Sequence, residues 1–156
     1  MVEIDVPGFR LLRLEHLLLD YNGTLAFDGK LLSGVEGLLR ELSEVITLHV
    51  LTADTFGGVS ACLEGLPCQI VLIPPGKQEE AKLGHVRRLG KDVCCAVGNG
   101  RNDRLMLKEA ALGIALIQAE GAAAETLYAA DLVCLSIQHA LGLLLNPLRL
   151  KATLRS

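Results

Sequence analysis

The feature that most constrains the fold is the regular alternation, from residue 16 onward, of short apolar runs with longer segments of helical periodicity. Short apolar runs that end at turn residues are typical of buried strands. In the first long segment the apolar residues recur at helical spacing, at Val35, Leu38, Leu39, Leu42 and Val45. Strands that alternate with helices of about ten residues indicate βαβ units and a parallel sheet with helices on both faces. The sequence therefore predicts an α/β fold built on a doubly wound, Rossmann-like parallel sheet.

The elements of this sheet can be placed along the chain. Residues 2–15 alternate apolar and polar side chains on both sides of Pro7-Gly8, which predicts an N-terminal β-hairpin. Strands are predicted at residues 16–20, 45–51, 68–73, 93–97, 113–117 and 132–135. Helices are predicted at residues 35–45, 55–65, 78–89, 101–111 and 122–130, and the remainder of the chain is expected to be mostly helical. Because no linker or internal repeat interrupts this pattern, we expect residues 1–156 to form a single domain.

Composition limits the classes of function. Aromatic residues make up 3% of the chain and the net charge is −3, so we expect neither a stacking surface nor a basic face for nucleic acid. The five cysteines include no C-x-x-C pair, which favours reduced, buried thiols over disulfides or structural zinc. The longest charge-free stretch, residues 132–148, is shorter than the ~20 apolar residues of a membrane-spanning helix. Since the N-terminus also lacks the apolar segment of a signal peptide, we expect a cytoplasmic protein with no membrane or nucleic-acid partner.

Polar residues stand where several predicted strands end. Asp20, in D-Y-N-G-T, follows the first buried strand, Thr52 follows the second, and residues 98–103, G-N-G-R-N-D, follow the fourth. Lys77 and Lys82 lie near the start of the helix between them. Each alone has an ordinary structural explanation, because Asp often stabilises turns and Lys on a helix usually faces solvent. In a doubly wound sheet, however, ligands bind outside the carboxyl ends of the strands. Together these residues provide a carboxylate nucleophile, a hydroxyl donor, a cation and oxygen ligands for a hard metal ion, as phosphoryl transfer requires.

This ordered set of motifs resembles the haloacid dehalogenase (HAD) superfamily of phosphohydrolases, and within it the phosphorylation domain of P-type ATPases. The D-K-T-G-T motif of those ATPases is similar to residues 20–24, their T-G-D motif to residues 52–54, and their G-D-G-x-N-D motif to residues 98–103. The resemblance runs from Leu14 to Leu135, and the chain looks like a soluble P-type ATPase-like protein. It implies a HAD-like fold, Mg²⁺ as the cofactor, and an aspartyl-phosphate on the first Asp of these motifs.

The resemblance also implies a role for each residue of the site. Asp20 is the implied nucleophile, while Thr52 and a lysine contact the phosphoryl oxygens. The implied ligands of Mg²⁺ are the Asp20 carboxylate, the main-chain carbonyl of Asn22, and the 98–103 loop through Asn99 and Asp103. The residues implied to lie beside the substrate are Gly23, Thr24, Ala53, Lys77 and Asn102.

Two lysines are candidates for the catalytic cation. In the family, this lysine is followed by apolar residues four and seven positions later, on the buried face of its helix. Lys82 fits this pattern, because Val86 and Leu89 occupy those positions. Lys77 precedes the helix and lies beside the turn at residues 74–76. We therefore favour Lys82 as the catalytic lysine and keep Lys77 as the alternative.

Two positions depart from the family pattern. Asn22 stands where many phosphatases of the superfamily carry an Asp that acts as general acid and base, a function worth about 10²- to 10⁴-fold in rate. Asn99 stands where a metal-binding Asp is common. The resemblance thus implies a slow Mg²⁺-dependent phosphohydrolase or phosphotransferase that favours good leaving groups. The alternative is a catalytically weak or inactive HAD-fold protein with a binding or regulatory role, which we weigh lower because Asp20, Thr52 and Asp103 are all present.

The spacing of the motifs leaves no room for a cap domain. Thr52 follows Asp20 by 32 positions, and one helix and one strand separate Thr52 from Lys82. We therefore expect a capless site, open to a phosphorylated small molecule or macromolecule. Receiver domains of two-component signalling also use an Asp, a Thr and a Lys, but they carry the Asp on a middle strand and are weighed lower. The Leu-rich residues 141–150 fit either a homo-oligomer or a helix packed on the sheet, and the four histidines show no metal-binding spacing.

Overall fold

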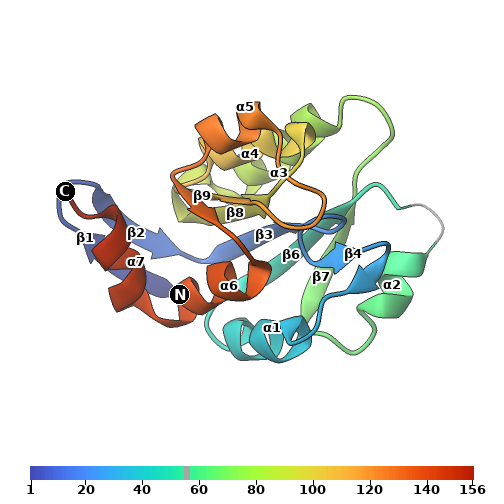
Figure 1. The fold of residues 1–156 in the computed structure, drawn as a ribbon, viewed down its shortest axis with the longest axis horizontal. Coiled ribbons are helices and arrows are strands. Elements are labelled where there is room, and N and C mark those ends of the chain that lie inside the picture. Colours follow the sequence, from blue (N-terminus) through green and yellow to red (C-terminus); the bar gives the residue numbers. More distant parts are fainter. Residues whose placement is uncertain (55–56) are drawn as a thin grey trace.

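The fold is organised around one parallel sheet (Figure 1). The computed structural model describes residues 1–54 and 57–156. Its six-stranded sheet has the order β10-β9-β8-β3-β6-β7, with every neighbouring pair parallel. The strands are β3 (His16–Asp20), β6 (Thr47–Thr52), β7 (Cys68–Leu72), β8 (Cys94–Gly98), β9 (Leu112–Leu116) and β10 (Leu132–Cys134). Counted from β3, this is the 3-2-1-4-5-6 order of the doubly wound Rossmann-type sheet, so the predicted fold class is confirmed. Receiver domains have the order 2-1-3-4-5 and are thereby excluded.

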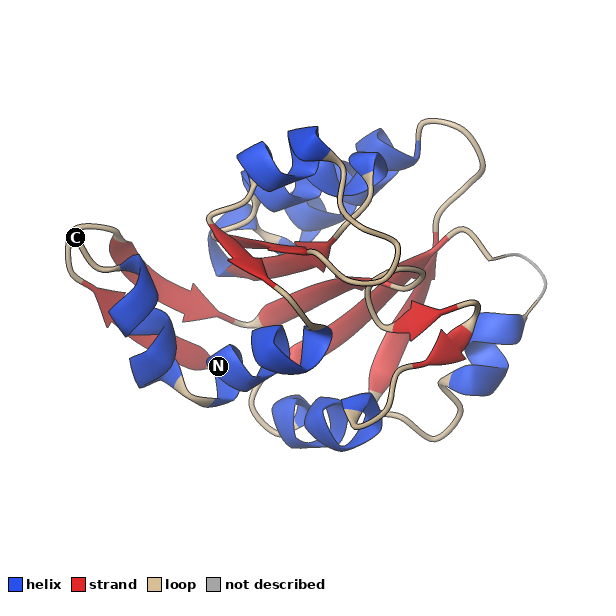
Figure 2. Cartoon of the chain, in the orientation of Figure 1, coloured by secondary structure: helices blue, strands red, loops and turns tan. Residues whose placement is uncertain are grey.

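Helices cover both faces of this sheet (Figures 1 and 2). One face is covered by α3 (Gln78–Leu89), α4 (Arg104–Glu109) and α5 (Ala124–Ala129), and the opposite face by α1 (Val35–Ser43) and α6 (Ile137–Leu145). Along β3, Leu17 and Leu19 belong to the core under α1 and α6, whereas Leu18 belongs to the core under α3 and α4. Because both faces are buried, the middle of β3 is apolar at three successive positions, Leu17 to Leu19, as the sequence pattern indicates.

The N-terminal hairpin extends this core at one end of the sheet. It consists of β1 (Val2–Val6) and β2 (Arg10–Leu14), and it packs with the C-terminal helix α7 (Pro147–Leu154) (Figure 1). The predicted hairpin is therefore confirmed. In the Leu-rich C-terminal segment, Leu141, Leu144 and Leu150 are buried in the core against the sheet. This packing accounts for much of the apolar surface of that segment within a single chain.

Short crossovers connect the strands that lead to the site. Residues 21–46 form two short strands, β4 (Ala26–Phe27) and β5 (Lys30–Leu31), followed by α1, so no cap domain lies within this range. The described part of the crossover from β6 to β7 contains α2 (Gly58–Cys62). The start of the predicted helix at 55–65 falls on residues 55 and 56, which lie outside the described residues. Among the helices of the described residues, none combines the length and apolar character needed to cross a membrane. All five cysteines are free thiols.

Two predicted boundaries shift for local reasons. The strand predicted to begin at Val45 begins at Thr47, because the N–H groups of Val45 and Ile46 still bond to the carbonyl of Leu42 at the end of α1. The helix predicted at 101–111 begins with a 3₁₀ turn at Arg101–Asp103 and ends at Glu109. That turn directs Asp103 back toward the sheet, which matters for the site.

Three histidines from separate elements form a buried chain of contacts. The Nδ1 atom of His16 lies 3.1 Å from Nε2 of His49, and Nδ1 of His49 lies 3.4 Å from Nε2 of His85. Arg88 in turn contacts Nδ1 of His85. Burial lowers the pKa of His49 to about 4, and coulombic interactions with His85, His16 and Arg88 act in the same direction. The spacing of these histidines along the sequence shows no sign of this arrangement.

We predict that His49 makes the protein acid-sensitive. The unfolded chain takes up a proton at this histidine near pH 6.5, whereas the folded chain resists it down to about pH 4. The free energy of unfolding should therefore fall as pH decreases from 7 to 5, by about 2 kcal/mol more in the native protein than in His49→Gln. Urea titrations of both proteins at pH 7 and pH 5 measure this difference. Parallel pH profiles for the two proteins would show that His49 does not contribute.

Candidate active site

Three charged side chains meet where the strand order of the sheet reverses, between β3 and β8. Asp20 is the last residue of β3, Asp103 lies just after β8, and Lys82 comes from the second turn of α3. The Nζ atom of Lys82 donates to Oδ1 of Asp20 at 2.7 Å and to Oδ1 of Asp103 at 2.6 Å. The side chain of Lys82 is 2% exposed and that of Asp20 is 14% exposed. We refer to Asp20, Lys82 and Asp103 as the charged triad.

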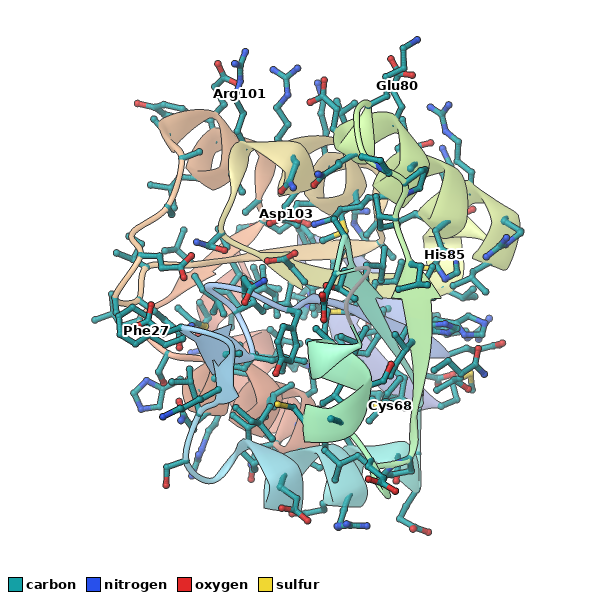
Figure 3. The ribbon with its side chains drawn as sticks, turned by 90° about the vertical axis from the view of Figure 1, so that its right-hand side faces the viewer. Phe27, Cys68, Glu80, His85, Arg101 and Asp103 are labelled. Atoms are coloured by element: carbon teal, nitrogen blue, oxygen red, sulfur yellow. The ribbon has the colours of Figure 1, made fainter. Side chains whose placement is uncertain are left out.

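Asp103 is held in place by the backbone of its own loop. Its Oδ2 atom accepts hydrogen bonds from the N–H groups of Asn99, at 3.0 Å, and Gly100, at 2.9 Å. A Cβ atom on Gly98 would lie 2.5 Å from this carboxylate, so the position requires glycine. Figure 3 shows Asp103 inside the molecule, whereas Arg101 of the same 3₁₀ turn extends outward. The G-x-G-x-N-D pattern therefore has a structural cause, which is that the last Asp folds back over the first Gly.

The charges of the triad do not cancel. Two carboxylates share one ammonium, and the cluster carries a net charge of −1 when all three groups are ionised. Burial raises the pKa of Asp20 to about 7, and the charge of Asp103 adds to this increase while Lys82 opposes it. Burial alone would disfavour the ammonium of Lys82, but the two carboxylates outweigh it and raise the pKa of Lys82. The site therefore favours additional positive charge.

The loop after β3 forms one wall of the site. Gly23 has a φ of +80°, and the Thr24 hydroxyl lies 3.4 Å from Oδ2 of Asp20 and 3.5 Å from Oδ1 of Asn99. Thr24 is fully buried, and the contacts of its hydroxyl link the Asp20 loop to the Asn99 loop. Asn22, one position before Gly23, is exposed.

A small cavity of about 180 Å³ opens onto the charged triad. Its lining residues are Asp20, Asn22, Thr52, Ala53, Gln78, Lys82, Asn99, Gly100, Asn102 and Glu120. Thr52 is 4% exposed, and its hydroxyl oxygen accepts a hydrogen bond from the N–H of Asp54 at 3.1 Å. A larger cavity of about 470 Å³ shares Asn22 and Ala53 with the first. The arrangement offers a small polar space beside Asp20 and a roomier one next to it.

The structure places the two candidate lysines differently. Lys82 lies in the charged triad, whereas Lys77 lies outside the lining of the cavity, with its side chain 83% exposed. The Nζ atom of Lys77 is 3.7 Å from Oε2 of Glu80, one turn further along α3. Lys82 is thus the lysine that the fold brings to Asp20.

Three residues at the site were not anticipated from the sequence. Gln78 accepts a hydrogen bond from Asn102 at 2.7 Å, and Glu120 lines the small cavity. Gln118 donates from Nε2 to the carbonyl oxygens of Gly23 and Thr24, at 3.1 and 3.0 Å. Their place in the sequence could have indicated two of them, because Gln118 and Glu120 follow β9 at the same edge of the sheet as the other site residues.

Two proteins of Methanocaldococcus jannaschii are similar in sequence to this chain. The uncharacterized protein MJ0073 is 46% identical over 84 residues, which are 51% of this chain and 90% of MJ0073. The uncharacterized protein MJ0072 is 49% identical over 39 residues, which are 25% of this chain and 89% of MJ0072. No family model matches the chain.

Solved structures of similar fold include HAD-superfamily phosphatases. The cobalt-bound deoxy-D-mannose-octulosonate 8-phosphate phosphatase of Haemophilus influenzae superposes with a TM-score of 0.71 at 14% identity, over 85% of this chain and 88% of that one. The Moraxella catarrhalis 3-deoxy-D-manno-octulosonate 8-phosphate phosphatase, solved with magnesium, phosphate and KDO, has a TM-score of 0.67 at 18% identity, over 91% and 94%. The catalytic domain of the CPx-ATPase CopB-B has a TM-score of 0.58 at 21% identity, over 72% of this chain and 44% of that one.

The strand order and these superpositions define the chain as a protein with the HAD-like fold, as its motifs predict. Within that fold the chain belongs to the family of the M. jannaschii protein MJ0073, of which it covers 90% at 46% identity.

We predict that Lys82 is required for stability as well as for the site. In Lys82→Met, two buried carboxylates lose their shared cation, so the free energy of unfolding at pH 7 should fall by about 3–5 kcal/mol. The loss should be smaller at pH 5, where protonation neutralises part of the uncompensated charge. Chemical denaturation at both pH values measures the two differences.

Lys77→Met is the matched control, since it makes the same change at an exposed position of the same helix region. It should alter the free energy of unfolding by no more than about 0.5 kcal/mol. Equal effects of the two substitutions would contradict the role given to Lys82 in the triad.

Proposed function

We propose that the chain is a HAD-type phosphohydrolase or phosphotransferase that works through an aspartyl-phosphate on Asp20. The observation that carries this proposal is the charged triad, in which a carboxylate faces a small polar cavity while a buried lysine holds it in place. The likeness in fold to HAD-superfamily phosphatases supports the same chemistry. We further propose that residues 1–156 act as a single HAD-like domain.

The reaction begins with a phosphorylated substrate in the small cavity. A lone pair of the Asp20 carboxylate forms a bond to phosphorus, and the bond to the leaving oxygen breaks with its electron pair. Lys82 orients Asp20 and offsets the negative charge that develops on the phosphoryl oxygens, and the Thr52 hydroxyl donates to one of these oxygens. A water molecule, or an acceptor hydroxyl in the phosphotransferase case, then takes the phosphoryl group from Asp20 and restores the carboxylate.

The residues present fit a divalent cation. The donor set contains the Asp20 carboxylate, the main-chain carbonyl of Asn22 and the side-chain oxygen of Asn99, which are the hard oxygen ligands that Mg²⁺ favours. Asp103 is fully buried and absent from the cavity lining, and it accepts hydrogen bonds from Lys82 and two backbone N–H groups, so we assign it to holding Lys82 and the loop. Bound Mg²⁺ supplies charge neutralisation as the phosphate approaches Asp20.

Asn22 sets the range of substrates. Its amide can neither donate an acidic proton to a leaving oxygen nor remove one from water, so poor leaving groups depart slowly. Acyl phosphates and anhydrides, whose leaving groups need no proton, are the favoured substrates. Because Asn22 also lines the larger cavity, the rest of the substrate, part of a small molecule or a macromolecule, has room beside it.

A second candidate function rests on the same two amides. With asparagine at positions 22 and 99, the HAD frame loses a proton carrier and an anionic ligand. A binding or regulatory protein that holds a phosphorylated partner without turning it over would need neither group. The phosphoenzyme experiment below separates the two functions.

We predict that the purified protein incubated with Mg²⁺ and acetyl phosphate gains one phosphoryl group, stable in acid and released by hydroxylamine. Intact-protein mass spectrometry measures the adduct of the native protein and of Asp20→Asn, which should form none. Asp5→Asn, at an exposed position of the hairpin, is the control and should label normally. Labelling that persists in Asp20→Asn, or no labelling of the native protein, would reject Asp20 as the nucleophile.

We also predict that Asn22→Asp accelerates hydrolysis, because it restores a group that can carry a proton. The gain in kcat should be about tenfold or more for alkyl phosphates and small for acetyl phosphate, whose leaving group needs no proton. Steady-state rates with the two substrate classes measure it, and each class controls for the other. An equal gain for both substrates would contradict the role assigned to this position.

A further inference from the structure

We infer that Glu120 provides the second carboxylate ligand of the divalent-cation site, in place of an acidic residue at position 99. This inference rests on the proposed function, because it concerns the same cavity. It adds to that site a residue from a different loop, between β9 and α5, for which none of the motifs predicts a role.

A tight turn places Glu120 at the cavity. The N–H of Gly121 donates to the carbonyl of Gln118 at 2.8 Å, and Gly121 adopts a φ of +70°. This closes residues 118–121 into a turn with Glu120 at its third position. Both the small cavity beside Asp20 and a neighbouring cavity of about 300 Å³ are lined in part by Glu120.

The turn is hydrogen-bonded to both loops of the site, the one after β3 and the one after β8. On one side, Nε2 of Gln118 donates to the carbonyl oxygens of Gly23 and Thr24. On the other side, Nδ2 of Asn99 donates to the carbonyl of Gly121 at 2.9 Å, and the N–H of Ala123 donates to the carbonyl of Asn99 at 2.9 Å. Since four hydrogen bonds fix residues on both sides of it, the backbone of Glu120 is held beside the Asn99 loop, and its exposed side chain lines the cavity.

Two oxygens converge above Gly23. A Cβ atom on this glycine would lie 2.6 Å from Oε2 of Glu120 and 2.6 and 2.7 Å from Nδ2 and Oδ1 of the Asn99 amide, so the carboxylate and the amide approach the same small space. Gly23 lies between Asn22 and Thr24, whose hydroxyl reaches Asp20. The oxygens of Glu120, Asn99 and the Asp20 loop thus form an all-oxygen donor set on one side of the cavity, as Mg²⁺ and Mn²⁺ favour.

The net charge of the site also supports Glu120 as a ligand of the cation. The triad carries −1 when ionised, and Asn22 and Asn99 add nothing to it. Glu120 brings the total to −2, which a divalent cation balances. Asp103 is fully buried, does not line the cavity, and already accepts hydrogen bonds from Lys82 and two backbone N–H groups. The carboxylate missing at position 99 is therefore supplied from the adjacent loop.

The test is metal binding by the free protein, measured by isothermal titration calorimetry of the EDTA-treated chain with Mn²⁺ at pH 7.5, with no phosphate donor present. Glu120→Gln keeps the size and polarity of the side chain but removes its charge. It should raise the dissociation constant for Mn²⁺ about tenfold. Glu41→Gln, an exposed position of α1 outside the cavity lining, makes the same change and should leave the constant unaltered.

A second substitution checks the charge argument. Asn99→Asp placed in the Glu120→Gln protein returns a carboxylate to the same donor set and should recover most of the lost affinity. Melting curves in EDTA verify that each variant is folded, and added Mn²⁺ should raise the Tm of the native protein more than that of Glu120→Gln.

The outcomes separate this inference from the proposed function. Equal Mn²⁺ affinity in Glu120→Gln and the native protein, or no saturable binding by the native protein, overturns the inference. An Asp20 adduct formed alongside either result leaves the proposed function standing. Conversely, a tenfold loss of affinity without any adduct supports the metal site and rejects the phosphoenzyme.

Discussion

The structure of the site depends on the burial of one ammonium group, that of Lys82, between two carboxylates. A charged lysine so far from water is tolerated only because Asp20 and Asp103 accept its hydrogen bonds. The three residues come from β3, α3 and the loop after β8, so this requirement fixes how α3 sits over the point where the strand order reverses. The glycine at position 98 serves the same arrangement, since any side chain there would displace Asp103.

Much of the fold could be predicted because its determinants are local. The apolar runs predict the strands, and the resemblance to the family, in which apolar residues follow the lysine as Val86 and Leu89 do here, favours Lys82 over Lys77. The contacts that escape prediction are those made between elements and loops far apart in the sequence. His16, His49 and His85 come from three elements and show no common spacing, yet they meet in the core. Gln118 and Glu120 belong to a turn whose direction depends on Gly121 and on bonds to loops about 20 and 95 residues away in the chain.

The two asparagines of the site change its electrostatics as well as its ligands. A phosphate dianion that approaches Asp20 meets amides at positions 22 and 99, where carboxylates would repel it. For the proposed function, these amides would lower the repulsion of phosphate, while position 22 lacks acid–base capacity. The carboxylate that is absent at position 99 is the one that we infer Glu120 to supply.

The central place of β3 also has a consequence for biosynthesis. Its two neighbours are β6, which follows within about 30 residues, and β8, which begins at Cys94. A nascent chain emerging from the ribosome therefore exposes one unpaired edge of β3 until the residues of β8 have been made. The N-terminal hairpin leads directly into that strand, so β3 is made early and gains its second neighbour only when β8 follows.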